Sequence, residues 1–130
     1  MEKKKILIID DSKPLCQMMQ AMLQENGPFE VRAESNPNLA IAAAGNYQPD
    51  LIILDILMPE VDGVTVAIHL RSDPILKDIP VMFLTAVAEQ DDLIFGNKIA
   101  GYQVVTKDVS TEKLIEAINK NFDGTNPQQE

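Results

Sequence analysis

The sequence predicts an α/β protein: a single doubly wound domain in which five strands alternate with five helices, written (βα)5. Short apolar runs alternate along the 130 residues with segments whose apolar residues recur at helical spacing. Such alternation is typical of a parallel sheet with helices on both faces and right-handed crossovers. A chain of this length suffices for one domain with a continuous core.

Five segments are expected to form the strands: residues 6–9, 29–33, 51–54, 81–84 and 104–106. Three of them, 6–9, 51–54 and 81–84, contain only apolar residues, as strands buried on both faces do. The segment 29–33 alternates only weakly between apolar and charged residues, which indicates an edge strand.

Helical spacing of apolar residues predicts the helices between these strands. The first begins near Ser12 and stops at Gly27. Its core face is expected to carry Leu15, Met18, Met19, Met22 and Leu23. The second opens at Asn36-Pro37 and ends at Gly45.

The remaining helices follow the third, fourth and fifth strands. Asp62 is expected to cap the third helix, Gly63 eases the turn before it, and Val64, Ala67 and Ile68 face inward. A weaker helix is expected over residues 91–100. Ser110 or Thr111 caps the last helix, whose core side carries Leu114, Ile115, Ile118 and Phe122.

The charge balance and the single cysteine exclude several classes of function. Lys and Arg number 11 against 20 Asp and Glu, and this net charge of −9 disfavours nucleic acid or an anionic membrane as a direct partner. Cys16 stands alone, so it forms no internal disulfide and no cysteine metal site. No apolar run approaches the length of a membrane span, and the first residues do not resemble a signal peptide. We therefore expect a cytoplasmic protein.

Four of the five predicted strands end in polar residues that a buried strand does not need. The first ends at Asp10 and Asp11, the third at Asp55, the fourth at Thr85 and the fifth at Lys107. The carboxyl ends of parallel strands meet at one edge of a sheet, where ligands bind in open α/β folds. These side chains are therefore expected to form one site.

Three carboxylates repel one another unless a cation or a proton accompanies them. Oxygen ligands without His or Cys favour a hard cation, and Mg²⁺ accepts one or two carboxylates together with phosphate oxygens. A lysine and a threonine hydroxyl supply the positive charge and the hydrogen bond that a phosphoryl group needs. A carboxylate can itself be the nucleophile, which yields an aspartyl phosphate.

Four motifs in order resemble the response regulator receiver (CheY-like) family. They are Ile-Asp-Asp-Ser at 9–12, Leu-Asp-Ile-Leu-Met-Pro-Glu-Val-Asp-Gly at 54–63, Asp-Ile-Pro-Val-Met-Phe-Leu-Thr-Ala at 78–86, and Lys107. The resemblance implies a flavodoxin-like fold with strand order 2-1-3-4-5. It also implies a receiver domain over residues 1–122, followed by a polar tail or linker at 123–130.

The resemblance further implies a role for each residue of the site. Asp55 would be the phosphoacceptor, Thr85 would donate a hydrogen bond to a phosphoryl oxygen, and Lys107 would pair with the phosphate. Asp11 would bind Mg²⁺ directly, and Asp10 would act mostly through water. Asp55 and the backbone carbonyl of Leu57 would complete the metal site.

The implied function is a signalling switch rather than an enzyme with its own substrate. The phosphoryl donor would be a phosphohistidine on a sensor histidine kinase or a histidine phosphotransfer protein. The downstream target is unknown, and homodimerisation on phosphorylation is left open. Two alternatives remain: a degenerate receiver that binds partners without phosphorylation, and an Asp-nucleophile phosphatase of the haloacid dehalogenase type. That phosphatase needs a second Asp two residues after the nucleophile, where this chain has Leu57.

Two positions depart from the family's pattern. Asp108 follows the active-site Lys107 where the family usually has Pro, so a trans peptide bond is expected there. Val104 replaces the usual aromatic readout residue, and Tyr102 lies two residues earlier on the same strand face.

The positions that flank the site lead to a hypothesis about the lifetime of the phosphate. Leu57 and Val87, each two residues past a site residue, are apolar and cannot orient a water molecule for attack. We expect a long-lived aspartyl phosphate. Cys16 and His69 are assigned no chemical role, because His69 has no second ligand or nucleophile nearby and Cys16 fits a small buried core residue.

Overall fold

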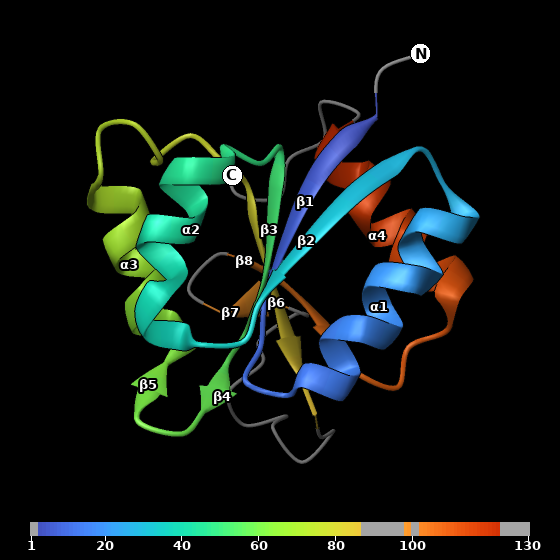
Figure 1. Cartoon of the computed structure of the whole chain (residues 1–130), viewed down its shortest axis with the longest axis horizontal. Coiled ribbons are helices and arrows are strands. Elements are labelled where there is room, and N and C mark those ends of the chain that lie inside the picture. The colour runs from blue at the N-terminus through green and yellow to red at the C-terminus, as the bar shows by residue number, and fades with distance from the viewer. Residues whose placement is uncertain (1–2, 87–97, 100–101, 123–130) are drawn as a thin grey trace.

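A six-stranded sheet runs through the centre of the molecule (Figure 1). The computed structural model describes residues 3–86, 98–99 and 102–122 of the chain. Its strand order is β2-β1-β3-β6-β8-β7. The strands are β1 (Lys4–Ile9), β2 (Phe29–Glu34), β3 (Leu51–Asp55), β6 (Val81–Thr85), β8 (Tyr102–Thr106) and the two-residue β7 (Lys98–Ile99).

The first five strands of this order are parallel, which confirms the expected doubly wound sheet with order 2-1-3-4-5. Consecutive register pairs run from Ile6↔Val31 through Ile8↔Ile53 and Ile53↔Met82 to Leu84↔Val105. The one addition is β7, which pairs antiparallel with β8 at the edge. A second sheet consists of the short hairpin β4 (Leu57–Met58) and β5 (Val61–Asp62).

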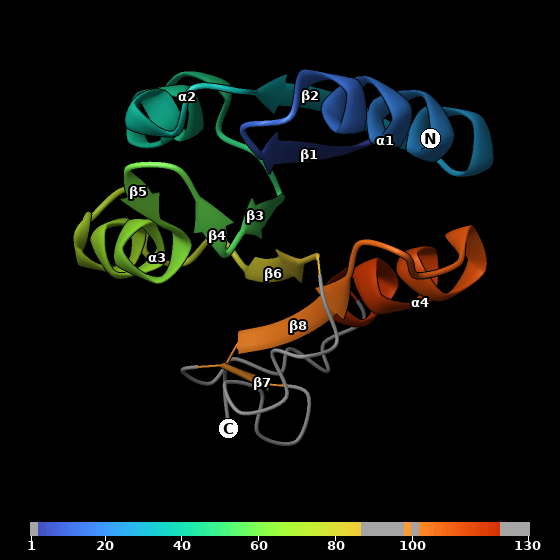
Figure 2. The same cartoon turned by 90° about the horizontal axis from the view of Figure 1, so that it is seen from below.

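Helices cover both faces of the sheet (Figure 2). They are α1 (Lys13–Asn26), the 3₁₀ helix η1 (Pro37–Leu39), α2 (Ala40–Tyr47), α3 (Gly63–Ser72) and α4 (Thr111–Phe122). One core lies between the sheet and α2 with α3, and the other lies between the sheet and α1 with α4. Alternate strand residues serve the two cores: Ile52 and Leu54 face the first, and Leu51 and Ile53 face the second.

Side-chain caps fix where most helices begin, as the sequence predicts. The Ser12 hydroxyl accepts a hydrogen bond from the Leu15 N–H at the start of α1. Asp62 caps α3 in the same way through the Val64 N–H, and Ser110 accepts from the Lys113 N–H in α4. Each cap satisfies a backbone donor that has no partner within its own helix.

The end of α2 differs from the prediction. The helix runs past Gly45 to Tyr47, because Gln48 adopts a left-handed backbone (φ 51°) and its N–H donates to the Ala44 carbonyl at 2.8 Å. A left-handed residue of this kind is a common helix stop. Its use by a glutamine is not visible in the sequence pattern.

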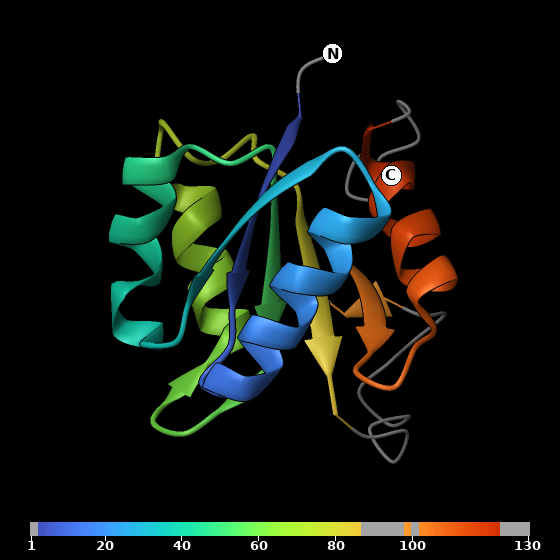
Figure 3. The ribbon, with the colours of Figure 1, turned by 45° about the vertical axis from the view of Figure 1, so that its right-hand side comes forward.

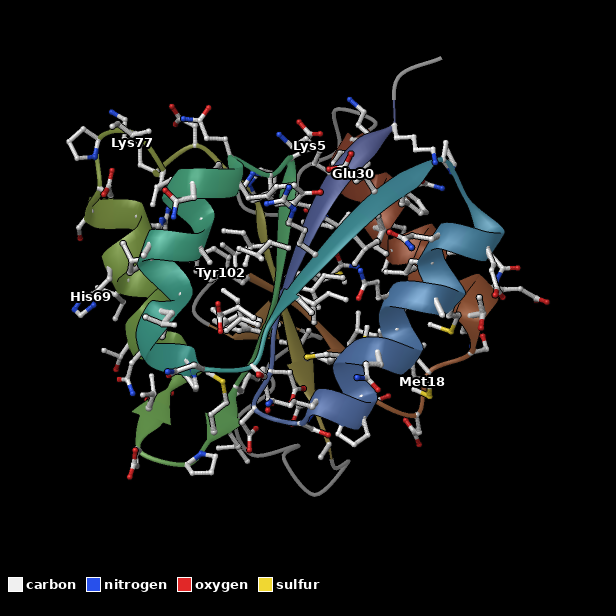
Figure 4. The ribbon with its side chains drawn as sticks, viewed as in Figure 1. Lys5, Met18, Glu30, His69, Lys77 and Tyr102 are labelled. Carbon is white, nitrogen blue, oxygen red and sulfur yellow. The ribbon has the colours of Figure 1, made fainter. Side chains whose placement is uncertain are left out.

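Two apolar residues that were expected in the core are exposed instead. The Met18 side chain on α1 is 53% exposed, and Ile68 on α3 is 56% exposed. Figure 4 shows Met18 on the outer side of α1, away from the sheet. Val66 and Leu70 take the inward positions on α3, one turn apart, so the core-facing stripe of α3 is rotated from the predicted one.

Two predicted segments lie wholly or mostly outside the described residues. Of the predicted helix over 91–100, only Lys98 and Ile99 are described, and they form β7 rather than helix. The polar segment from Asp123 onward is not described, so the predicted tail stays a prediction. Within the described residues, no helix is long and apolar enough to cross a membrane.

Candidate phosphorylation site

The polar strand ends predicted from the sequence do meet at one edge of the sheet. β1, β3, β6 and β8 point the same way in Figure 3, so their carboxyl ends lie side by side. Asp10, Asp55 and Thr85 are buried there, with exposed fractions of 0%, 2% and 0%. Asp11 is exposed at the mouth of the site.

Lys107 joins the strands of this edge through its side chain and its backbone. Its ammonium nitrogen lies 2.9 Å from Asp10 Oδ2 and 3.2 Å from Asp55 Oδ2. Its backbone N–H donates to the Thr85 carbonyl at 2.7 Å, which extends the pairing of β6 with β8 by one residue. Every peptide bond in the described residues is trans, which confirms the trans bond expected between Lys107 and Asp108. With this bond trans, the Lys107 side chain contacts both carboxylates.

The two buried carboxylates each have one backbone donor besides the lysine. The Ser12 N–H donates to Asp10 Oδ1 at 2.9 Å, and the Leu57 N–H donates to Asp55 Oδ1 at 3.3 Å. The Cys16 thiol donates to the Asp10 backbone carbonyl at 3.3 Å, and burial raises the pKa of this thiol to about 11. Cys16 is therefore a buried, protonated core residue, as its position predicts.

The charges of this edge are only partly matched. Burial, and then repulsion from Asp10, raise the pKa of Asp55 to about 6, although Lys107 and the Leu57 N–H act in the opposite direction. Burial lowers the pKa of Lys107, but its contacts with Asp10 and Asp55 outweigh this and the net pKa is raised. One ammonium thus contacts two buried carboxylates, and ionisation of Asp55 lowers the stability of the folded protein.

Two further features suit an additional group at this site. One oxygen from each of Asp10, Asp11 and Asp55 lies within 4.8 Å of the others, a spacing at which three carboxylates can hold one cation. The buried Thr85 hydroxyl has no hydrogen-bond partner among the described residues, although such groups are nearly always paired. The acidic trio therefore suits a metal ion.

Gly63 and the hairpin before it position the backbone of Asp55, a role that the sequence does not predict for them. Gly63 lies so close to the end of β3 that an added Cβ would meet the Asp55 carbonyl oxygen at 2.1 Å. The Gly63 N–H donates to the Ile56 carbonyl at 2.9 Å, and the β4–β5 hairpin fills the interval between them. Glu60 turns this hairpin with a φ of 68° after Pro59. Gly63 was predicted to ease a turn, but its observed role is close backbone approach.

Residues 6–119 match the sequence pattern of the response regulator receiver domain. The chain belongs to this family. Receiver domains interact with histidine kinases and act as signalling modules, and the acidic pocket and Lys107 are those of a receiver.

Curated relatives of this receiver include longer proteins and one of similar length. The phosphate regulon transcriptional regulatory protein PhoB of Pseudomonas aeruginosa is 33% identical over 124 residues, which cover 95% of this chain and 54% of that protein. Protein PilH of the same species is 31% identical over 115 residues, which cover 88% of this chain and 94% of PilH. The receiver therefore spans about half the length of PhoB.

Solved receivers share the fold. A putative response regulator from Chloroflexus aurantiacus aligns with a TM-score of 0.79 and 28% identity, covering 92% of this chain and 97% of that one. The chemotaxis protein CheY4 of Vibrio cholerae aligns with a TM-score of 0.75 and 27% identity, covering 91% of this chain and 98% of that one.

The aromatic side chain of β8 is locked into the core of this receiver. Tyr102 is 3% exposed, and its ring makes an edge-to-face contact with Phe83 at 5.3 Å. The Arg71 guanidinium lies 5.3 Å from the centre of the same ring. The register Phe83↔Val104 continues without a bulge to Thr85↔Thr106, so Tyr102 does not shift into the position that Val104 occupies.

Proposed function

We propose that this receiver accepts a phosphoryl group on Asp55 and thereby switches its interactions with a partner. The observation that carries the proposal is the incompletely matched edge of the sheet. There, the carboxylates of Asp10 and Asp55 share Lys107, and the Thr85 hydroxyl has no partner among the described residues. A cation and a phosphoryl group would satisfy all of these groups at once.

The proposed transfer is a nucleophilic displacement at phosphorus. An Asp55 carboxylate oxygen forms the new O–P bond as the P–N bond of a phosphohistidine breaks, and the imidazole keeps the electron pair and takes up a proton. The Thr85 hydroxyl donates to one phosphoryl oxygen. Lys107 exchanges its contact with Asp55 for one with the phosphate, which needs little movement because the two groups are 3.2 Å apart.

Asp10, Asp11, Asp55 and the Leu57 carbonyl would hold Mg²⁺ in this proposal. When bound, Mg²⁺ supplies positive charge that offsets the carboxylates and the developing charge on the phosphoryl oxygens. The acidic trio supports this assignment because its oxygens already lie within 4.8 Å of one another. The carbonyl of Leu57 is proposed from the family resemblance.

The proposed donor is a sensor histidine kinase or a histidine phosphotransfer protein, and the proposed setting is the cytoplasm. The free, buried Cys16 thiol fits a reducing compartment. The proposed domain occupies residues 1–122, which contains the matched range 6–119. Release of the phosphoryl group is proposed to be slow, because the Leu57 side chain beside Asp55 is apolar and 53% exposed. Val87, the other flanking residue of this hypothesis, lies outside the described residues.

Incubation with acetyl phosphate and Mg²⁺, followed by intact mass measurement, tests the proposal. We expect a single added phosphoryl group in the wild type and none in the Asp55→Asn variant. An unmodified wild type would favour the degenerate receiver, which binds without phosphorylation. Multiple turnover of the phosphoryl donor would favour the Asp-nucleophile phosphatase.

A further inference from the structure

The outer edge of β2 is one of the two edges of the main sheet, and α1 covers it with two side chains. The direction of the β2 backbone follows from its pairing with β1. The Lys4 N–H donates to the Pro28 carbonyl and the Asp10 N–H donates to the Glu34 carbonyl. Even-numbered residues of β2 therefore face β1, and Val31 directs its N–H and C=O away from the sheet.

Two glutamines of α1 take up both of these outward groups. The Gln20 side-chain amide donates to the Val31 carbonyl at 2.8 Å, and the Val31 N–H donates to the Gln24 side-chain oxygen at 3.1 Å. The two glutamines are four residues apart and therefore lie on the same face of α1. Together they supply one donor and one acceptor to a single residue, as a residue of a neighbouring strand would.

The two glutamines satisfy the backbone groups of the buried Val31, and they also block an edge that would otherwise be open. An edge strand with free N–H and C=O groups is a template for pairing with another chain. β2 is six residues long, whereas β7 at the opposite edge has only two. Among the described residues, Gln20 and Gln24 make the only side-chain hydrogen bonds from α1 to the β2 backbone.

The charges along β2 favour β2 of a second copy of this chain as the strand that would pair with the open edge. If two β2 strands met antiparallel with Val31 opposite Val31, the two valines would exchange both hydrogen bonds now made to the glutamines. Glu30 of each copy would then lie opposite Arg32 of the other. Glu30 and Arg32 are exposed on β2, where they also contact Tyr47. Opposite charges at directly facing positions stabilise a strand pair, so the edge is complementary to itself.

We propose that Gln20 and Gln24 close the β2 edge against pairing with a second copy of this chain. Because this edge is closed, the receiver associates through other surfaces. Association through those surfaces can depend on whether Asp55 is phosphorylated. This role is independent of the phosphorylation chemistry, because the outward groups of Val31 lie at the sheet's edge and not at its carboxyl end.

The double variant Gln20→Ala/Gln24→Ala tests this inference, with Gln17→Ala as the matched control. Gln17 is exposed on α1 and bonds no β2 backbone group in the described structure. In sedimentation experiments with EDTA and no phosphoryl donor, we expect the double variant to self-associate at least about tenfold more tightly than the control. Equal self-association of the two variants would overturn the proposal.

Two further measurements assign the association to β2. Adding Arg32→Glu to the double variant places like charges opposite each other and should return it to the control's behaviour. Association that survives this change would overturn the proposed pairing. In the single variant Gln24→Ala at low concentration, the Val31 amide should exchange its hydrogen roughly fivefold faster than in Gln17→Ala. An unchanged rate would show that Gln24 does not cover this amide.

Discussion

Polar clusters lie at both ends of the sheet, and they differ in how fully their groups are matched. At the carboxyl end, Asp10 and Asp55 share one lysine, and the buried Thr85 hydroxyl has no partner among the described residues. At the amino end, Tyr47 is equally buried, but its hydroxyl donates to the Glu30 carboxylate at 2.7 Å and lies 3.1 Å from the Glu30 carbonyl.

The amino-end cluster also places two cations against the Tyr47 ring. The Lys5 ammonium and the Arg32 guanidinium lie 4.7 and 4.5 Å from the centre of the Tyr47 ring. The backbone N–H of Lys5 donates to the Asp50 carboxylate at 2.8 Å, and this bond links β1 to the residue before β3. Figure 4 shows Lys5 beside Glu30 at this end of the sheet. Burial and the hydrogen bond to Glu30 raise the pKa of Tyr47, so it stays neutral and paired.

This difference in pairing indicates that the amino-end cluster stabilises the fold, whereas the carboxyl-end cluster suits a ligand. A polar cluster whose buried hydroxyl is paired stabilises the protein and needs nothing further. A cluster that keeps an unpaired hydroxyl and a carboxylate of raised pKa reduces stability, and such sites are candidates for function. The following substitutions test whether the two clusters behave in these two ways.

The largest effect is expected from removal of the lysine at the carboxyl end. Lys107→Met leaves Asp10 and Asp55 without their shared cation, so incorporation of phosphoryl groups from acetyl phosphate should fall by about a hundredfold or more. The matched control is Lys5→Met at the amino end, which should react at the wild-type rate. Similar losses in the two variants would contradict the contrast between the clusters.

A smaller effect is expected at the position beside the phosphoacceptor. Leu57→Asn introduces a side chain that can orient water, so the phosphorylated variant should hydrolyse faster by on the order of ten- to a hundredfold. The decay of the phosphorylated mass with time measures this rate. Leu39→Asn, at another exposed apolar position, is the control and should hydrolyse at the wild-type rate. Equal rates for Leu57→Asn and the wild type would disprove the hypothesis.

The smallest effect concerns the amino-end cluster and should appear in stability alone. Tyr47→Phe removes the hydrogen bond to Glu30 and should lower the free energy of unfolding by about 1 kcal/mol. Urea unfolding measures this change. Phosphorylation of Asp55 should be unaffected, and a reduced extent of phosphorylation would mean that the two clusters are coupled.

The sequence predicts the carboxyl-end cluster well because strand ends carry their own signal. Asp10, Asp55 and Thr85 each interrupt an apolar run, and the parallel sheet brings such interruptions together. The caps Ser12 and Asp62 are predicted for a similar reason, since they bond only to residues two or three positions away.

Features that depend on contacts between distant segments are not predicted. Gly63 approaches the backbone of Asp55 across the β4–β5 hairpin, and its sequence context indicates only a turn. Gln20 and Gln24 are ordinary surface residues until β2 is placed beside them. The prediction from helical spacing that Met18 lies in the core is also wrong. An apolar residue at the border of the core-facing stripe of a helix can be either buried or exposed.

At neutral pH the carboxyl end of the sheet is expected to hold Asp55 ionised at the expense of stability. The folded-state pKa of about 6 exceeds the ordinary value of 3.8, so the native state loses stability as pH rises through this range. At pH 7.5 in EDTA, Asp55→Asn removes that loss and should be more stable than the wild type by on the order of 1–3 kcal/mol.

Urea unfolding of the wild type and Asp55→Asn, each in EDTA and in Mg²⁺, measures this loss of stability. We expect the variant to be the more stable protein in EDTA, and Mg²⁺ to stabilise the wild type more than the variant. A variant that is less stable than the wild type in EDTA, with equal stabilisation of both proteins by Mg²⁺, would contradict it.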